Sequence, residues 1–266
     1  MTPALVFRGV SKQFANYPVL DGIHLEASLG AFLSVVGPSG CGKSTLLNLA
    51  AGLIEASTGV IEVFGQPLTG INRRAGYVFQ QEVLLPWKTV LDNVRLGPAL
   101  AGLPKEQSVT LAREWIRRVG LEAFSHCYPH QLSGGMRKRV AMAQTWITKP
   151  DIVLMDEPFA ALDVHTRIQM QMELLHLWSS TKNTVLFVTH DLEEAIALAD
   201  EVLVLSAGPG SRIVGRYPIE LERPRNLIDI KTEDAFREIY RAIWRDLRLE
   251  VQRSYERSGQ TLQLAR

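Results

Sequence analysis

The stretch Gly37-Pro-Ser-Gly-Cys-Gly-Lys-Ser-Thr45 directly follows the apolar run 31–36. Glycines at this spacing, closed by Lys-Ser, fit a phosphate-binding loop whose backbone N–H groups surround a phosphate chain at the start of a helix. The apolar run supplies the buried strand from which such a loop begins. Lys43 is expected to reach the β- and γ-phosphates, and Ser44 to bind Mg²⁺. An ordinary glycine-rich turn is the alternative. The residues expected to bind nucleotide here are Gly37, Pro38, Ser39, Gly40, Cys41, Gly42, Lys43, Ser44 and Thr45.

A second motif, Ile152-Val-Leu-Met-Asp-Glu-Pro-Phe159, is a short apolar run that ends in two carboxylates. The run is typical of a buried parallel strand that delivers charge to the carboxyl edge of a sheet. Asp156 is expected to hold Mg²⁺ through water. Glu157 points differently on the pleat and is expected to polarise an attacking water. A strand that ends in a solvated turn is the alternative, and the phosphate-binding loop makes it the weaker one.

A third motif, Leu132-Ser-Gly-Gly-Met136, lies between the other two. With it, about the first 220 residues resemble the nucleotide-binding subunit of an ATP-binding cassette (ABC) transporter. The resemblance implies ATP and Mg²⁺ as cofactors. It also implies that Ser133, Gly134 and Gly135 bind the γ-phosphate held by an opposite subunit. Met136 replaces the usual glutamine, but the contacts come from a hydroxyl, N–H groups and a helix N-terminus, so this departure need not abolish binding.

Two further positions match the family near the N-terminus. Phe14 resembles the aromatic residue that stacks on adenine, and Tyr17 is the rival for this role. Gln80, in Gly76-Tyr-Val-Phe-Gln80, resembles the glutamine that reports Mg²⁺ and γ-phosphate occupancy to the membrane partner. Gln81 is the less favoured alternative for that position.

Two more positions match in the second half of the chain. Ala161-Leu-Asp163 resembles the loop that crosses the dimer interface, so Asp163 is assigned to the nucleotide site. His190 follows the apolar strand 184–188 and matches the family's switch histidine, which contacts the γ-phosphate and the site of the attacking water. A histidine at the end of a strand is more often a structural residue, but the strand, the spacing and Asp191 favour the functional interpretation.

The composition of the chain agrees with this assignment. Its 266 residues are 46% hydrophobic and 21% charged, with a net charge of +1, which excludes a disordered chain and gives no sign of nucleic-acid binding. No apolar run is long enough to cross a bilayer and no export signal is recognised, so we expect a cytoplasmic location. Cys41 and Cys127 predict no disulfide framework. Cys41 is expected to fill the loop, although a helix N-terminus can make a thiol reactive and its modification inhibitory.

The fold class predicted is α/β, and the resemblance implies a P-loop NTPase (RecA-like) core with a mixed sheet. Short alternating strands near 5–10, 19–25 and 60–64 predict an N-terminal antiparallel β subdomain. Helical periodicity from about 89 to 150 predicts an inserted α-helical subdomain. Strands at 152–155, 184–188 and 201–205, separated by helices containing 167–178 and 192–198, continue the parallel core. An ABC ATPase domain is therefore expected over 1–225, and a helical extension over 226–266.

The resemblance also implies how the parts work together. Lys43, Asp156 and Glu157 are expected on one lobe and Ser133 on another that faces away, so two copies would sandwich two ATP molecules head to tail. Hydrolysis assisted by Glu157, with His190 and Gln80 as the other catalytic residues, would release the two copies from each other. This cycle would drive an integral membrane permease.

Four stretches resemble the nitrate/sulfonate/taurine type of bacterial importer: Leu84–Val94, Glu173–Trp178, Ser206–Ile213 and Glu222–Arg225. They imply import of a small solute, an indirect partner in a solute-binding protein, and peripheral attachment at the cytoplasmic face of the bacterial inner membrane. The cargo stays open because the ATPase does not touch the solute. The alternatives are a soluble ABC ATPase of repair or translation, and a regulatory ABC protein without turnover.

Two segments are expected to make contacts beyond the catalytic motifs. Leu84-Leu-Pro-Trp87 is an apolar cluster in an expected surface loop and is proposed to meet the permease, unless it packs under the helical lobe. The tail has apolar residues at helical spacing and predicts one amphipathic helix that packs on its own core, or on a permease, dimer or regulatory partner. Its apolar positions are Phe236, Ile239, Tyr240, Ile243, Trp244 and Leu247.

Overall fold

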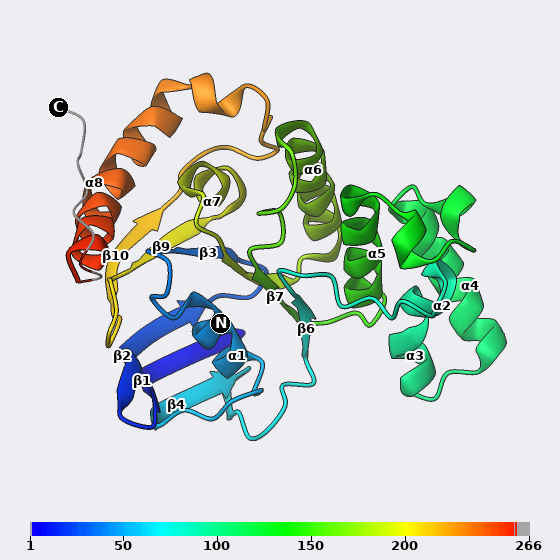
Figure 1. Cartoon of the computed structure of the whole chain (residues 1–266), viewed down its shortest axis with the longest axis horizontal. Helices are drawn as coiled ribbons and strands as arrows, with labels where there is room; N and C mark the ends of the chain where they lie inside the picture. The colour runs from blue at the N-terminus through cyan, green and yellow to red at the C-terminus, as the bar shows by residue number, and fades with distance from the viewer. Residues whose placement is uncertain (1, 258, 260–266) are drawn as a thin grey trace. The chain divides into compact units, whose positions relative to one another are not determined.

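A computed structural model describes residues 2–257 and 259 of the chain. Its internal contacts divide the chain into two compact units (Figure 1). The first unit contains Met1–Arg73 and Lys182–Arg266, and the second contains Arg74–Thr181. The boundaries predicted from the sequence, at 89, 150 and 225, stay predictions.

One difference from the expected lobes concerns the carboxylates. Asp156 and Glu157 share the second unit with Ser133, whereas they were expected to share a lobe with Lys43. In the second unit, β6 (Ala75–Val78) and β7 (Ile152–Asp156) form a parallel pair.

The first unit begins with a four-stranded antiparallel sheet in the order β2-β1-β4-β5. Its strands are β1 (Leu5–Phe14), β2 (Tyr17–Ala27), β4 (Thr58–Val63) and β5 (Gln66–Pro67). Alternating buried and exposed residues along β2 give this sheet one face toward the core and one toward solvent. The expected N-terminal antiparallel sheet is therefore present.

The parallel core of the first unit is centred on β3 (Phe32–Val36). This strand pairs in parallel with β8 (Thr184–Val188) and β9 (Glu201–Leu205), and β10 (Ile213–Pro218) pairs antiparallel to β9. Every residue of β3 and β8 is buried, which explains why both are mostly apolar, with Ser34 and Thr184 as the polar exceptions. The carboxyl ends of the parallel strands meet at one edge, where the helices α1 (Lys43–Ala50) and α7 (Leu192–Leu198) follow.

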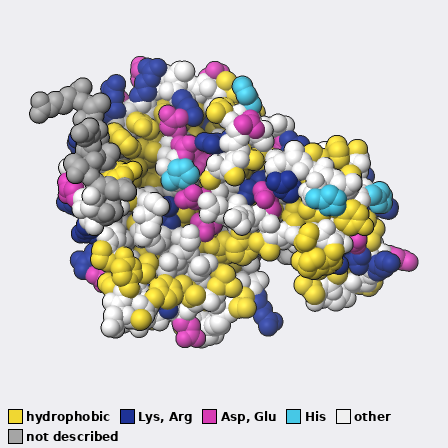
Figure 2. Space-filling model, viewed as in Figure 1, with side chains coloured by type: hydrophobic (Ala, Val, Ile, Leu, Met, Phe, Trp, Pro, Cys, Tyr) yellow, Lys and Arg dark blue, Asp and Glu magenta, His cyan; other side chains and the backbone are white. Residues whose placement is uncertain are grey.

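The second unit consists of the β6–β7 pair and five α-helices. The helices are α2 (Val90–Val94), α3 (Leu96–Leu100), α4 (Lys105–Arg118), α5 (Gly134–Trp146) and α6 (Val164–Thr181). Short 3-10 turns at Glu122–Phe124 and Pro129–Gln131 connect α4 to α5. Three buried tryptophans, Trp115, Trp146 and Trp178, fill its interior. Figure 2 shows that hydrophobic side chains also gather on the surface of its helical part.

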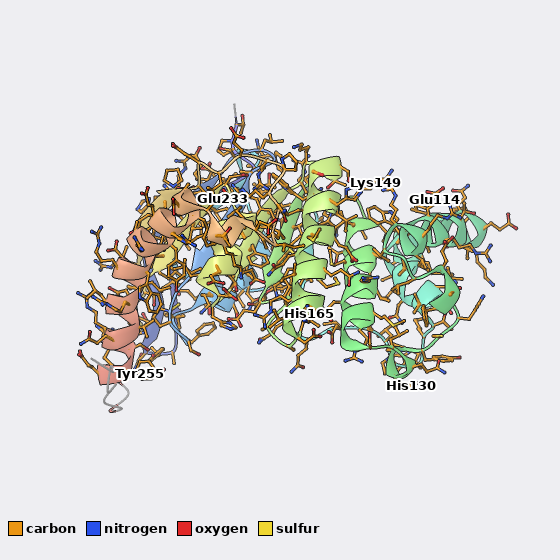
Figure 3. All side chains as sticks on the ribbon, turned by 90° about the horizontal axis from the view of Figure 1, so that it is seen from above. Glu114, His130, Lys149, His165, Glu233 and Tyr255 are labelled. Carbon is orange, nitrogen blue, oxygen red and sulfur yellow. The ribbon has the colours of Figure 1, made fainter. Side chains whose placement is uncertain are left out.

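The last element described in the first unit is a long helix, α8 (Asp234–Arg257), which follows β10 after a short 3-10 turn at Ile230–Thr232. Figure 3 shows Glu233 just before its start and Tyr255 near its end. The helix lies against α7, β9 and β10 of the first unit. The predicted amphipathic helix is present, and Phe236, Ile243 and Leu247 of its apolar stripe are buried, whereas Trp244 is 40% exposed.

Candidate functional site

The phosphate-binding loop leaves β3 at its buried end and turns into α1. A Cβ added at Gly37 would lie 2.8 Å from the Sγ atom of Cys41 and 3.0 Å from the carbonyl oxygen of Leu205, so only glycine fits there. Gly40 and Gly42 have φ angles of 76° and 93°, in the left-handed region that favours glycine. Helix α1 starts at Lys43 with no side-chain cap, so its first N–H groups point to the loop.

Lys43 is folded back onto the loop from which it extends. Its Nζ atom donates hydrogen bonds to the carbonyl oxygens of Gly37 at 2.9 Å and Pro38 at 3.0 Å. The side chain is only 6% exposed, which places a cation at the positive end of α1. The ammonium group of Lys43 and the positive end of the α1 dipole both favour the binding of an anion at this loop.

The remaining residues of the loop differ in exposure. Ser39, Gly40 and Ser44 are exposed, whereas Cys41 is only 1% exposed and faces Gly37. Ser44 therefore presents its hydroxyl on the surface, as a metal-binding serine requires. The sulfur of Cys41 is packed inside the loop, so a thiol reagent would first have to open the loop, and the inhibitory modification of Cys41 stays a prediction.

The two candidates for adenine stacking lie together at the end of the β1–β2 hairpin. Phe14 and Tyr17 are paired across the strands, and both are exposed. The Nζ atom of Lys12 lies 4.8 Å from the centre of the Phe14 ring. The hairpin thus presents two neighbouring aromatic rings, and Phe14 stays the predicted stacking residue with Tyr17 as its rival.

His190 follows β8 at the same edge of the first unit as the phosphate-binding loop. The side chain of His190 is exposed, while its neighbour Thr189 is 2% exposed and donates a hydrogen bond of 2.5 Å to Glu194. Asp191 caps α7 by accepting hydrogen bonds from the N–H groups of residues 193 and 194. These bonds fix the backbone on both sides of the histidine.

In the second unit, β7 ends in the two carboxylates of the second motif. Asp156 accepts a 3.5 Å hydrogen bond from the hydroxyl of Tyr77 on β6. Burial, followed by the charge of Asp156, raises the pKa of Tyr77 well above its usual value, so this hydroxyl stays a donor. Glu157 has a φ of 41°, a left-handed backbone conformation that is unusual for a residue with a side chain.

Gln80 lies in the loop after β6, and Lys138 of α5 holds this loop. The Nζ atom of Lys138 donates hydrogen bonds to the carbonyl oxygens of Gln80 at 2.5 Å and Phe79 at 3.3 Å, and lies 3.6 Å from the carboxylate of Glu82. Lys138 is 1% exposed, and its burial lowers its pKa despite the opposing charge of Glu82. Sequence reasoning did not identify this residue, because the pattern of α5 carries no sign that a lysine is buried.

The third motif begins α5. The hydroxyl oxygen of Ser133 accepts a 3.3 Å hydrogen bond from the N–H group of Met136 and caps the helix. A Cβ on Gly135 would lie 2.7 Å from a methyl carbon of Thr166, so the helix start packs closely on α6. Asp163 accepts a 3.1 Å hydrogen bond from the N–H of Thr166, and bonds to this residue lower its pKa. Ser133, Gly134, Gly135 and Asp163 thus belong to one neighbourhood.

The residues present fit a nucleotide with Mg²⁺. The loop offers N–H groups at an uncapped helix start and the cation of Lys43, as a phosphate chain requires. Ser44, Gln80 and Asp156 supply the oxygen ligands that Mg²⁺ prefers. The two units hold separate parts of this set, with Ser44 in the first and Gln80 and Asp156 in the second.

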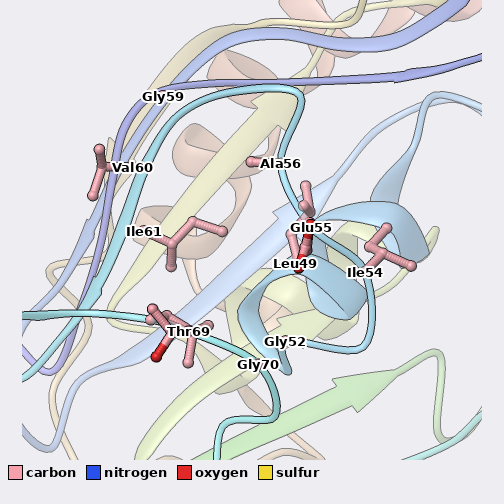
Figure 4. Close-up of a pocket in the computed structure, with 11 residues that line it drawn as sticks. Leu49, Gly52, Ile54, Glu55, Ala56, Gly59, Val60, Ile61, Thr69 and Gly70 are labelled. Atoms are coloured by element: carbon pink, nitrogen blue, oxygen red, sulfur yellow. The ribbon is translucent and has the colours of Figure 1, made fainter.

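One cavity lies apart from the predicted site residues. A cavity of about 300 Å³ in the first unit, shown in Figure 4, lies between the end of α1 and β4. Its lining includes Leu49, Ile61 and one charged residue, Glu55, but none of the predicted site residues. None of the described helices is long and apolar enough to cross a membrane.

Comparisons with known proteins agree with these motifs. A family model for ABC transporters matches residues 20–160. An uncharacterised ABC transporter ATP-binding protein of Methanocaldococcus jannaschii is 49% identical over 235 residues, which cover 88% of this chain and 86% of that protein. The taurine import ATP-binding protein TauB of Escherichia coli (strain K12) is 46% identical over 217 residues, covering 80% of this chain and 85% of TauB.

A solved structure is similar as well. It is a dimeric ATP-binding cassette in a post-hydrolysis state with ADP and Pi, 30% identical, with a TM-score of 0.72. The match covers 82% of this chain and all of that one. This likeness confirms the α/β P-loop NTPase fold that the three motifs predict. Together with the family match and the relatives, it shows that the chain belongs to the ATP-binding subunits of the ABC transporter family.

Proposed function

We propose that this protein is the ATP-hydrolysing subunit of an importer for a small solute of the nitrate, sulfonate or taurine class. The observation that carries the proposal is the phosphate-binding loop, where the buried Lys43 and an uncapped helix start create an anion site. The similarity to a taurine import protein supports the direction of transport and the class of solute. Family membership makes ATP hydrolysis the reaction.

Each catalytic residue has a proposed role. Lys43 holds the β- and γ-phosphates, and Ser44, Gln80 and Asp156 hold Mg²⁺, which supplies charge neutralisation when it is bound. Glu157 orients the attacking water and accepts its proton, and the unusual left-handed backbone at this residue supports a functional role. His190 hydrogen bonds at the γ-phosphate and at the position of that water.

The assembly proposed is a head-to-tail homodimer. A solved dimeric cassette of the same fold supports it. Ser133, Gly134 and Gly135 of one copy bind the γ-phosphate held by the other, at the start of α5, while Asp163 lies at the interface between the copies. The charge of Asp163 and the hydroxyl of Ser133 are exposed, as a contact between copies requires.

The permease is proposed to bind the loop that follows Gln80. Trp87 is 70% exposed and Val83 59%, so these side chains remain on the surface of the second unit. A cavity of about 390 Å³ beside this loop is lined by Phe79, Val83, Leu85 and α5 residues, among others. The loop starts at Gln80, so a change at the metal site is passed directly to this surface. We place the protein at the cytoplasmic face of the cell membrane, with a solute-binding protein as an indirect partner and no nucleic-acid partner.

The test is capture of membrane partners with a variant that binds ATP and does not hydrolyse it. Tagged Glu157→Gln protein, loaded with ATP and Mg²⁺, is used to capture partners from detergent-solubilised membranes of the native host. Mass spectrometry is expected to identify a polytopic permease. Lys43→Ala protein is the matched control and is expected to lose the ATP-dependent part of the capture. Recovery of soluble proteins or nucleic acid alone would contradict the importer.

A further inference from the structure

The turn between β9 and β10, residues 206–212, lies behind the phosphate-binding loop in the first unit. A Cβ placed on Gly208 would be 3.7 Å from the carbonyl oxygen of Gly40, and a Cβ on Gly37 would be 3.0 Å from that of Leu205. The far end of the turn is held by β2, because Gly210 and Ser211 donate 2.9 Å hydrogen bonds to the carbonyls of residues 18 and 19. The turn therefore supports the loop from one side.

The near end of this turn is held by α8. One carboxylate oxygen of Glu250 accepts a 2.8 Å hydrogen bond from the N–H group of Ala207, and Arg253 donates to the other at 2.5 Å. Arg257 donates to the carbonyl oxygens of Ala207, at 3.3 Å, and Gly208. Both backbone groups of Ala207 are thus bound by the last two turns of α8.

Glu250 occupies a position where a carboxylate is costly. It is 4% exposed and lies on the buried face of α8 with Ile243 and Leu247. An apolar side chain there would continue the stripe and would bury the N–H group of Ala207 without a partner. Packing of α8 alone therefore does not explain this residue, whereas a need to fix Ala207 does.

A cavity between α8 and the phosphate-binding loop is a second observation that links this helix to the nucleotide site. It has a volume of about 370 Å³ and lies between α8 and the start of the phosphate-binding loop. Gly37, Pro38, Ser39 and His190 form one part of its lining, and α8 contributes five side chains, including Trp244 and Tyr255. All of these residues belong to the first unit. The C-terminal helix thus borders the two motifs that are proposed to contact the γ-phosphate.

We propose that Glu250 and Arg257 are positioning residues that set the conformation of the phosphate-binding loop through the turn at Ala207–Gly208. The loop binds phosphate with backbone N–H groups, whose alignment depends on the backbone behind them. Loss of the bonds to Ala207 releases the turn and lets the loop depart from its binding geometry. The proposal rests on the proposed function only in that this loop binds nucleotide.

The experiment compares three variants of the full chain by calorimetric titration with Mg²⁺ and ADP, which avoids turnover. Glu250→Ala is expected to weaken ADP binding about 3- to 10-fold, the effect of one lost hydrogen bond passed on to the loop. Glu250→Gln keeps an oxygen that accepts from Ala207 and is expected to stay within about 2-fold of the wild type. Leu249→Ala, which changes the adjacent exposed residue, is the matched control and is expected to have no effect.

Steady-state kinetics and thermal unfolding separate positioning from folding. We expect Glu250→Ala to raise the KM for ATP and to change kcat less, because correctly loaded sites still turn over. Should Glu250→Ala fail to fold, Arg257→Ala removes the second, exposed contact and is expected to weaken ADP binding in the same direction. A lower melting temperature with unchanged ADP affinity would overturn the proposal, as would a Gln variant as impaired as Ala. Wild-type protein that binds no ADP would instead contradict the proposed function.

Discussion

The two units hold the reaction's components in different forms. In the first unit, the anion site is made of backbone groups and one buried cation, and Lys43 already rests on the loop carbonyls. In the second unit, the components are side chains at the ends of elements, such as Asp156 at the end of β7 and Ser133 before α5. The first unit thus holds the phosphate-binding loop together with His190, and the second holds Glu157 and further side chains proposed to contact Mg²⁺ and a second copy. We expect variants of the phosphate-binding loop to change nucleotide affinity most, and variants of the second unit to change turnover most.

The largest effect is expected from Lys43→Ala in the first unit. The variant loses the only side-chain cation that the described loop, residues 37–45, places at the phosphates. We expect nucleotide affinity to fall by roughly 100-fold or more, since charge-assisted contacts to phosphate are the strong ones. Titration with ATP and Mg²⁺ measures this, with Lys12→Ala as a control that removes a surface cation. Retained affinity would show that the loop's N–H groups suffice.

Glu157→Gln in the second unit is expected to have the opposite profile. The amide keeps the size of the side chain and loses the base, so turnover is expected to fall by roughly 100-fold or more. Nucleotide affinity should stay near that of the wild type, because Lys43 and the phosphate-binding loop are unchanged. Phosphate release and gel filtration with ATP and Mg²⁺ measure the two properties. A variant that remains monomeric with ATP would count against the proposed dimer.

A smaller effect is expected from Lys138→Met, which removes the cation beneath Gln80. The carbonyl oxygens of Phe79 and Gln80 lose a donor, and Glu82 keeps its ion pair with Arg137, at 3.8 Å. We expect kcat to fall about 3- to 10-fold, with a smaller change in ATP affinity, because a loop of the second unit is loosened. Glu82→Gln is the matched control for the ion pair. Equal losses of kcat and ATP affinity in Lys138→Met would contradict the prediction that changes in the second unit affect turnover more than binding.

The pH dependence of stability provides a second readout for Lys138. Burial lowers the pKa of this amine below 10.5, so in the window between its folded pKa and 10.5 the unfolded chain binds more protons. The contribution of Lys138 to the free energy of unfolding therefore rises with pH through this window and is lost as pH falls through the folded pKa. Urea unfolding at several alkaline pH values is expected to show this slope in the wild type and a weaker one in Lys138→Met.

The smallest effect is expected at the two cysteines. Cys41 is buried, whereas Cys127 is partly exposed, so a thiol reagent is expected to modify Cys127 first. Cys41→Ser should hydrolyse ATP within about 2-fold of the wild type, because serine fills nearly the same space. Mass spectrometry of briefly alkylated protein identifies the modified residue. Rapid labelling of Cys41 would show that the phosphate-binding loop opens readily.

The sequence predicts the parallel core of the first unit well, because its strands are short apolar runs bounded by clear turns. The run 184–188 is β8 to the residue, and the helix expected at 192–198 is α7. Strands β6 and β10 were not predicted. Both are partly exposed and contain glycine, so neither an apolar run nor a clean alternation marks them.

The functional motifs follow from spacing, but the residues that support them do not. Lys138 lies among basic residues that look like a solvated surface, and only packing shows that it is buried. Glu250 could have been identified from the sequence, because it continues the helical spacing of Ile243 and Leu247 on the buried face of α8. A carboxylate in such a stripe indicates a buried hydrogen-bond acceptor. The sequence pattern does not predict contacts between residues that are distant in the chain, and such contacts determine the roles of Lys138 and Glu250.

Arg225 limits how far this protein can be shortened. Its buried guanidinium donates to the carbonyl oxygens of Ile196, Ala197 and Ala199 at the end of α7, and burial lowers its pKa to about 10. A chain that stops before this residue leaves those carbonyls without their donor, at the helix that follows His190. A chain that stops just after it keeps this cap but loses α8 and the segment before it, including the buried Leu227 and Ile230. A shortened protein therefore has to keep Arg225, and the role proposed for Glu250 and Arg257 requires that it keep α8 as well.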